Sequence, residues 1–193
     1  MQNLPRVTFG FVNCNRLFYL KSCVESLLKC TENYKNKEII IVDNASIEEG
    51  TQEYLNTLKA RGHLVKQQES RDPANEFARA KNIIVDNATG DYICPITGDL
   101  QFILSDGWLE EFVNIYEKFS DQIGCILFDA QRTVRNQSGR YSETLGDSNY
   151  RFVFDYNRPP VAAATNAMFS KKKRHAPFVK PRTAPGGDVP LFW

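Results

Sequence analysis

Two short apolar runs near the start of the chain constrain its fold most. Residues 7–12 (VTFGFV) and 38–42 (EIIIV) lack the polar alternation of a half-exposed strand. Such runs are typical of strands that are covered on both faces of a sheet. Between them, residues 16–30 carry leucine and valine at helical spacing. A strand, a helix and a second buried strand in this order predict a parallel pair with the helix packed on the sheet.

The same alternation continues to about residue 128. An S-x-x-E pattern at Ser46 and Glu49 has the form of a capping box and predicts the start of the second helix. The further predicted elements are this helix to about Ala60, a strand over 63–67, a helix over 77–88, a strand over 91–96, a helix over 106–119 and a strand over 124–128. We therefore predict an α/β fold with a mostly parallel sheet flanked by helices. A chain of 193 residues suits one sizeable core, so we expect a single domain over 1–193.

Polar residues follow three of the predicted strands at the point where each strand ends. In open α/β sheets the ligand lies outside these carboxyl ends, so the residues there are the first candidates for a binding site. They are Asn13, Asn15 and Arg16 after the first strand, Asp43 and Asn44 after the second, and Thr97, Gly98 and Asp99 after the fourth. The pattern predicts two carboxylates at one rim of the sheet.

Several common catalytic motifs are absent from the sequence. No G-x-G-x-x-G follows the first strand, no G-x-x-x-x-G-K-[ST] occurs, no serine lies in a G-x-S-x-G elbow, and the chain has two histidines. A dinucleotide site, a P-loop and triad hydrolysis are therefore poorly supported. A site that binds a nucleotide through carboxylates, with a metal on its diphosphate, is the class that remains.

The cysteine count and the hydropathy of the chain bear on its class and on the compartment in which we expect it. The five cysteines are odd in number and form no C-x-x-C pair, which argues against a disulfide framework or a zinc site. No apolar run approaches the roughly 20 residues of a membrane-spanning helix, and the first residues do not resemble a signal peptide. We expect a cytoplasmic protein, or one at the cytoplasmic side of a membrane.

Charge is distributed unevenly along the chain. Residues 131–182 carry 11 Lys or Arg against three acids, although the formal net charge is only +1. Within this part, the basic run 171–174 is most simply a solvated surface. Its functional alternatives are contact with a donor diphosphate, with an anionic acceptor or with an acidic membrane surface. We expect no nucleic-acid partner.

Several segments resemble family 2 glycosyltransferases of the GT-A fold. In chain order they are 7–16 (VTFGFVNCNR), 38–46 (EIIIVDNAS), 80–82 (AKN), 88–93 (ATGDYI), 95–99 (PITGD) and 187–189 (GDV). The segment 38–46 matches the family's E-I-I-V-V-D-N-x-S motif almost residue for residue. The segment 95–99 stands where the family has its D-x-D motif, but Thr97 replaces the first acid.

The resemblance implies a role for each candidate residue. Asp43 would accept the N3–H of uracil, Lys81 would reach the nucleotide, Asp99 would hold Mg²⁺ or Mn²⁺, and Asp188 would be the catalytic base. Asn13, Asn15, Arg16 and Gly98 would complete the nucleotide site. Simpler alternatives are that Asp43 caps the next helix, that Lys81 is a solvated helix residue and that Asp188 belongs to a turn.

The function implied is transfer of a sugar from a nucleotide diphosphate, with UDP-sugar as the expected donor. The acceptor would be a hydroxyl of an unknown saccharide, lipid or protein, and the reaction would invert the anomeric centre with help from the metal. The alternatives are a catalytically impaired nucleotide-sugar-binding relative and a nucleotidyltransferase.

The resemblance also divides the chain into two parts. Residues 1–100 would form the nucleotide-binding half and 101–193 the acceptor half. Members of the family continue past this point with helices that close over the acceptor. We therefore expect this chain to bind a nucleotide diphosphate but to transfer sugar poorly alone, as part of a longer protein or with a partner that completes the cleft.

Overall fold

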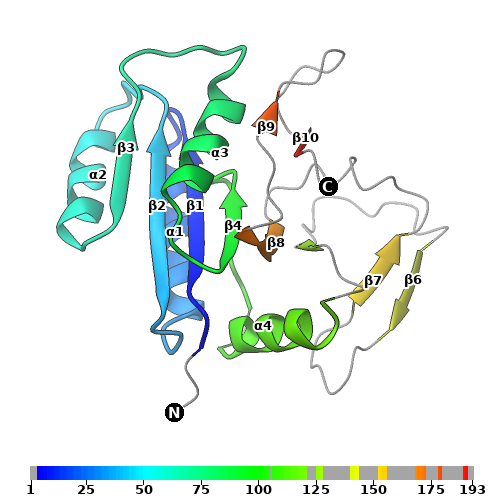
Figure 1. The fold of residues 1–193 in the computed structure, drawn as a ribbon. Helices are drawn as coiled ribbons and strands as arrows, with labels where there is room; N and C mark the ends of the chain where they lie inside the picture. The colour runs from blue at the N-terminus through cyan, green and yellow to red at the C-terminus, as the bar shows by residue number, and fades with distance from the viewer. Residues whose placement is uncertain are drawn as a thin grey trace.

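The computed structural model describes residues 4–104, 106–120, 125–127, 140–143, 152–155, 168–172, 178–179 and 189–190. Its centre is a six-stranded sheet of order β3-β2-β1-β4-β8-β5 (Figure 1). The strands are β1 Val7–Asn13, β2 Lys37–Asp43, β3 Leu64–Gln67, β4 Tyr92–Ile96, β5 Ile126–Leu127 and β8 Met168–Lys171. The first four strands pair in parallel, and β8 and β5 add an antiparallel edge. The predicted α/β fold with a mostly parallel sheet is confirmed.

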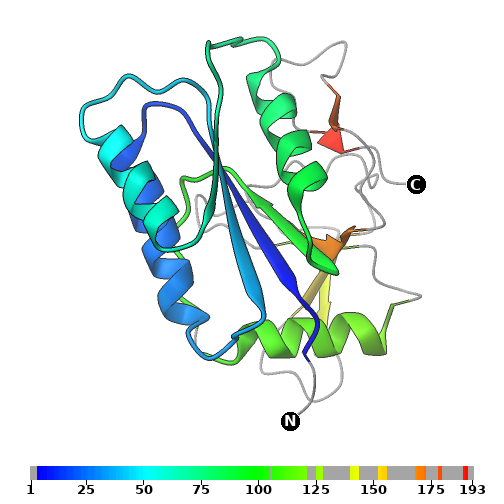
Figure 2. The ribbon, with the colours of Figure 1, turned by 60° about the vertical axis from the view of Figure 1, so that its left-hand side comes forward.

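Helices cover both faces of this sheet (Figure 2). They are α1 Leu17–Cys30, α2 Thr51–Ala60, α3 Glu76–Asn87 and α4 Trp108–Lys118. Buried side chains of α1, α2 and α4 join one apolar cluster with one face of the strands. Those of α3 join a second cluster on the other face.

Strand β1 shows why the early part of the chain adopts this layering. Phe9 and Phe11 belong to the cluster under α1, whereas Val12 belongs to the cluster under α3. Gly10 lies directly below α3, because a Cβ atom there would meet Cγ2 of Ile84 at 2.1 Å. Both faces of the strand are therefore covered, as its uninterrupted apolar run predicts.

Strand β8 comes from the late part of the chain and lies between β4 and β5. Tyr92 of β4 is opposite Lys171, and Ile126 of β5 is opposite Phe169. The rings of Tyr92 and Phe169 stack with centroids 4.9 Å apart, and Tyr116 of α4 meets both rings edge-on. These aromatic contacts attach β8 to the core.

Two small antiparallel pairs complete the described structure. Strand β6 Arg140–Glu143 pairs with β7 Phe152–Asp155, and β9 Phe178–Val179 pairs with β10 Val189–Pro190. The β9–β10 pair lies beside α3 in both views (Figures 1 and 2). No helix in the described part of the chain is long and apolar enough to cross a membrane.

The predicted capping box at Ser46 and Glu49 is wrong. Helix α2 begins at Thr51 after Gly50, which has a left-handed backbone (φ 77°) and makes no side-chain cap. The hydroxyl of Ser46 donates to Asp43 instead, at 2.5 Å. The Ser46 oxygen accepts from the N–H of Asn15 and from Nδ2 of Asn13, so other donors take the place of the helix N–H groups.

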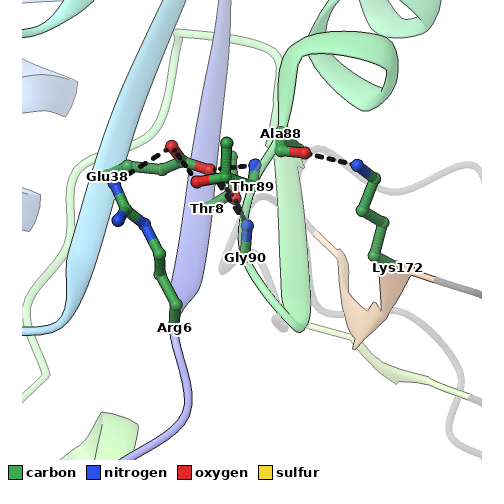
Figure 3. A network of polar contacts seen from close by, with 7 residues as sticks. All are labelled: Arg6, Thr8, Glu38, Ala88, Thr89, Gly90 and Lys172. Atoms are coloured by element: carbon green, nitrogen blue, oxygen red, sulfur yellow. Dashed lines mark hydrogen bonds and ion pairs between the residues drawn. The ribbon is translucent and has the colours of Figure 1, made fainter.

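A polar network joins the starts of the central strands (Figure 3). The Glu38 carboxylate accepts hydrogen bonds from the hydroxyl of Thr8, from both N–H and hydroxyl of Thr89, and from the N–H of Gly90. It also pairs with Arg6 at 3.3 Å. Burial alone would raise the pKa of Glu38, but these hydrogen bonds and the arginine outweigh it and hold the pKa below its ordinary value.

The same network reaches the segment after β8. The backbone N–H of Lys172 donates to the carbonyl of Asp91 at 2.9 Å, and its ammonium donates to the carbonyl of Ala88 (Figure 3). Lys171 pairs with Glu117 of α4 at 3.2 Å. Both lysines thus lie at the end of the sheet where β4 begins, opposite the rim that carries Asp43 and Asp99.

Candidate functional site

The carboxyl ends of β1 and β2 are joined through Asp43. Its Oδ1 accepts from Nδ2 of Asn13 at 2.8 Å and from the Ser46 hydroxyl, and its Oδ2 accepts from the Ser46 N–H at 3.0 Å. Asp43 is 1% exposed. The carboxylate makes no cap on α2, which begins at Thr51. The helix-cap alternative for Asp43 is therefore wrong, and the residue organises the turn after β2.

Asn13 presents an acceptor at the same place. Its Nδ2 donates to Asp43 and to Ser46 Oγ at 3.2 Å, so the amide orientation is fixed. Its buried Oδ1 has no hydrogen-bond partner among the described residues. A buried acceptor of this kind is costly unless a ligand or a water donates to it.

Asn15 joins the loop after β1 to the loop after β2 through hydrogen bonds. Its Oδ1 accepts from the N–H groups of Ile47 and Glu48 at 2.7 and 3.1 Å, and its own N–H donates to Ser46 Oγ at 2.8 Å. Glu48 in turn accepts from the N–H of Leu17, the first residue of α1, at 2.8 Å. Asn15 has a left-handed backbone (φ 49°), which asparagine tolerates better than most residues. Its described side-chain contacts are with the backbone, and a direct nucleotide contact stays a prediction.

The turn after β4 brings Asp99 to this rim. Gly98 has φ 77°, and a Cβ atom there would lie 2.5 Å from the carbonyl oxygen of Val12 at the end of β1. Oδ1 of Asp99 accepts from the Thr97 hydroxyl at 2.6 Å, and Oδ2 lies 3.4 Å from Nη1 of Arg16. The structure thus brings together Arg16, Gly98 and Asp99, which follow two different strands in the sequence.

The described residues do not fit a divalent cation well. None of their His, Cys, Asp and Glu side chains form a group of three or more that could hold a metal ion. Mg²⁺ can accept a single carboxylate together with phosphate oxygens and waters. Here, however, the carboxylate of Asp99 already contacts an arginine through one oxygen and a hydroxyl through the other.

Lys81 lies on the inner side of α3. It is 4% exposed, and its Nζ is 4.2 Å from the ring centroid of Phe77. The alternative of a solvated helix lysine is therefore wrong. Burial of an ammonium is costly without compensating contacts, and the aromatic face of Phe77 supplies one of them.

Arg71 and Glu76 belong to the same neighbourhood and were missed from the sequence. The arginine donates through Nε and Nη2 to the two oxygens of Glu76 at 3.1 and 2.7 Å. Burial raises the pKa of the Cys14 thiol, and the charges of Arg71, Glu76, Asp43 and Arg16 all act on it. Arg71 and Glu76 therefore lie close enough to this rim for their charges to act on Cys14. Arg71 lies before α3 in no recognisable motif, so no pattern in the sequence pointed to it.

The structure describes only some of the remaining predicted residues. Asp188, Lys173 and Arg174 lie outside the described residues. Asp188 directly precedes β10, whose partner β9 lies beside α3, the helix that carries Lys81.

Comparison with known proteins gives a consistent set of similarities. The family model described as "Glycosyl transferase family 2" matches residues 10–175. The uncharacterized protein y4gI of Sinorhizobium fredii is 29% identical over 126 residues, which are 65% of this chain and 13% of that protein.

Similar solved structures are glycosyltransferases with the GT-A fold. TarS 1–349 of S. aureus has a TM-score of 0.64 at 14% identity, covering 86% of this chain and 47% of that one. The same protein is known in complex with UDP and with UDP-GlcNAc. The mannosyltransferase PcManGT of Pyrobaculum calidifontis, in complex with GDP-Man and Mn²⁺, has a TM-score of 0.60 at 15% identity and covers 97% of this chain and 50% of its own. This chain therefore spans about half the length of these structures.

Proposed function

The chain belongs to glycosyl transferase family 2, and from this premise we propose that it moves a sugar from a nucleotide diphosphate to an acceptor hydroxyl. One observation carries the proposal. The Asn13–Asp43–Ser46 cluster and the Thr97–Asp99 turn meet at the carboxyl ends of parallel strands, where ligands bind in open α/β sheets. The cluster offers acceptors for a nucleobase, and Asp99 lies beside the cation of Arg16.

We propose a UDP-linked sugar as the donor. Uracil presents a single N–H between two carbonyl groups, and an anionic acceptor such as Asp43 suits that N–H. TarS, which has a similar fold, is known with UDP-GlcNAc, whereas PcManGT is known with GDP-Man. A direct comparison of UDP and GDP binding therefore tests the choice of base.

The transfer itself would proceed with inversion. The bond from the anomeric carbon to the diphosphate oxygen breaks, and the acceptor oxygen forms its bond to the opposite face of that carbon. The acceptor proton passes to a carboxylate base, for which we propose Asp188. The acceptor is a hydroxyl of a saccharide, a lipid or a protein. We also propose that the basic run 171–174 contacts a membrane surface.

A catalytically impaired nucleotide-sugar-binding relative is the second candidate. Thr97 favours it, because a neutral hydroxyl stands where the family has an acid and donates to Asp99. Donor hydrolysis and sugar transfer, measured with a panel of acceptors, separate the two candidates. Donor binding without either reaction would favour the impaired relative.

Removal of the Asp43 carboxylate tests the nucleotide site. Asp43→Ala should weaken UDP binding by about 1.5–3 kcal/mol, the usual value of a hydrogen bond to a charged group. Asp106→Ala removes an exposed carboxylate before α4 and should leave the affinity unchanged. Calorimetric titration measures both.

Pyrophosphate serves as the control for this titration because it has no base. Asp43→Ala should bind pyrophosphate as the wild type does. If pyrophosphate and UDP binding fall together, Asp43 only maintains the structure of the rim. If UDP affinity does not change, Asp43 does not contact the base.

A further inference from the structure

We propose that Arg16, rather than a divalent cation, neutralises the donor diphosphate in this chain, so that nucleotide diphosphates bind without metal. The inference rests on the proposed function and concerns the same rim. The residues that contact Asp99, Thr97 and Arg16, do not suit the metal that the resemblance implies.

The first support is the position of Arg16. The residue ends the loop between β1 and α1, and its Nη1 lies 3.4 Å from Oδ2 of Asp99. Its side chain is 62% exposed, whereas that of Asp99 is 17% exposed. A guanidinium has five N–H donors in a planar fork that matches phosphate oxygens. Asp99 can therefore hold one edge of the arginine while most of the fork faces outward at the rim.

The second support is the charge balance around Asp99. A site with two acids can balance a divalent cation, but Thr97 leaves one acid here, and Arg16 already balances it. A metal bound to Oδ2 would lie within a few ångströms of the guanidinium and would be repelled by it. An anionic diphosphate is attracted to the same arginine. The described side chains at this rim therefore favour an anion directly and a metal poorly.

The third support is that other described cations near this rim or in the basic run are buried or already bound to protein groups. Lys81 is 4% exposed, with its Nζ over the ring of Phe77. Arg71 uses Nε and Nη2 on the carboxylate of Glu76. Lys171 and Lys172 lie at the opposite end of the sheet, bound to Glu117 and to the carbonyl of Ala88. The Arg71 side chain is 45% exposed, and two of its nitrogens are used on Glu76, whereas Arg16 is 62% exposed and contacts Asp99 through Nη1. Of these two guanidinium groups, Arg16 therefore presents more of its fork outward.

The test is a calorimetric titration of UDP and of GDP into the whole chain, in EDTA and in Mn²⁺. We expect the wild-type affinity for the tighter nucleotide to agree within about twofold between the two buffers. Arg16→Gln should bind at least about tenfold more weakly in EDTA, because a charge-assisted contact is lost. Arg16→Lys, which keeps the charge but not the fork, should fall in between.

Arg61→Gln is the matched control. Arg61 also forms an exposed ion pair, with Glu25 at 2.6 Å, but it lies before β3 at the opposite end of the sheet. Its change should leave both affinities unaltered. In Arg16→Gln the carboxylate of Asp99 is released, so Mn²⁺ should recover part of the affinity. Adding Asp99→Asn to that variant should remove the recovery.

The outcomes of this titration distinguish a failure of the role of Arg16 from a failure of the proposed function. Wild-type binding that falls more than about tenfold in EDTA overturns the role of Arg16 and leaves the proposed function intact, as does unchanged affinity in Arg16→Gln. Absence of binding to UDP and GDP in both buffers contradicts the proposed function and this inference with it.

Discussion

Gly98 is held in a place where a side chain does not fit. Its backbone is left-handed (φ 77°), and a Cβ atom there would run into the carbonyl oxygen of Val12. Gly62 has a similar backbone (φ 87°), but a Cβ atom added there would meet nothing within 4 Å. The two glycines therefore separate the cost of the left-handed backbone from the cost of the close approach.

Gly62→Ala should lower the free energy of unfolding by about 1–2 kcal/mol, the cost of a left-handed alanine. Gly98→Ala should lower it by at least about 1 kcal/mol more, because β1 and the turn before Asp99 must move apart. Unfolding in urea measures both changes. Equal losses of unfolding free energy in the two variants would mean that the turn before Asp99 accepts the added Cβ atom without an energetic penalty. The rim would then be less rigid than its contacts imply.

Individual residues of the site were predictable from the sequence where the end of a strand determines their place at the rim. Asn13 and Asp43 end buried strands and Asp99 follows one, and parallel pairing brings such residues to one rim. The contact between Arg16 and Asp99 was not predictable, because it depends on how the loops after β1 and β4 approach each other. The role of Ser46 was mistaken for a helix cap because the sequence shows spacing but not which N–H groups lie nearest the hydroxyl oxygen.

Among the elements, Glu38 connects more parts of the sheet than its position at the start of β2 suggests. It binds Thr8 of β1 and the turn between α3 and β4 at Thr89 and Gly90. The same turn is held by Lys172 after β8. One carboxylate thus joins three of the central strands at the end opposite the site.

Because the pKa of Glu38 is lowered in the folded protein, its contribution to stability is present above the unfolded pKa of about 4.3 and is lost as the pH falls through the folded value. Glu38→Gln should lower the stability at pH 7 and flatten the acid dependence below about pH 4.5. Glu53→Gln, on an exposed position of α2, controls for the loss of one carboxylate. Urea unfolding at pH 7, 5 and 3 measures the effect. An unchanged acid profile in Glu38→Gln would show that the network does not depend on the charge.

The early elements were predictable because their patterns are local. β1, α1 and β2 follow from apolar runs and helical spacing within a few residues of the expected bounds. The pairing of β8 was not predictable. Its four residues carry no strong pattern, and their partner β4 lies far away in the sequence. Of the strand expected over 124–128, the structure describes Ile126–Leu127 as a strand, and its partner is β8.

For the whole molecule, ligand binding should appear as thermal stabilisation. A nucleotide at about 100 times its dissociation constant adds about 2.7 kcal/mol, and about 2–4 °C per kcal/mol is usual for this size. We expect UDP or UDP-sugars to raise the midpoint of thermal unfolding by about 5–10 °C. The panel should contain GDP and GDP-Man as competitors for the choice of base, and uridine as a control without phosphate. A shift with uridine equal to that with UDP would place the binding energy in the nucleoside and not in the phosphates, and no shift with any nucleotide would contradict the proposed function.

The late position of β8 has a consequence for the order in which the protein is made. A ribosome releases β1 to β4 with their helices well before it reaches Met168–Lys171. Until then the outer edge of β4 has no strand beside it, and the ring of Tyr92 lacks its stacking partner Phe169. An unpaired edge with an exposed aromatic ring is a template for unwanted association. A nascent chain that stalls between β4 and β8 should therefore be a client for chaperones, and messages that slow translation in this interval should lower the yield of native protein.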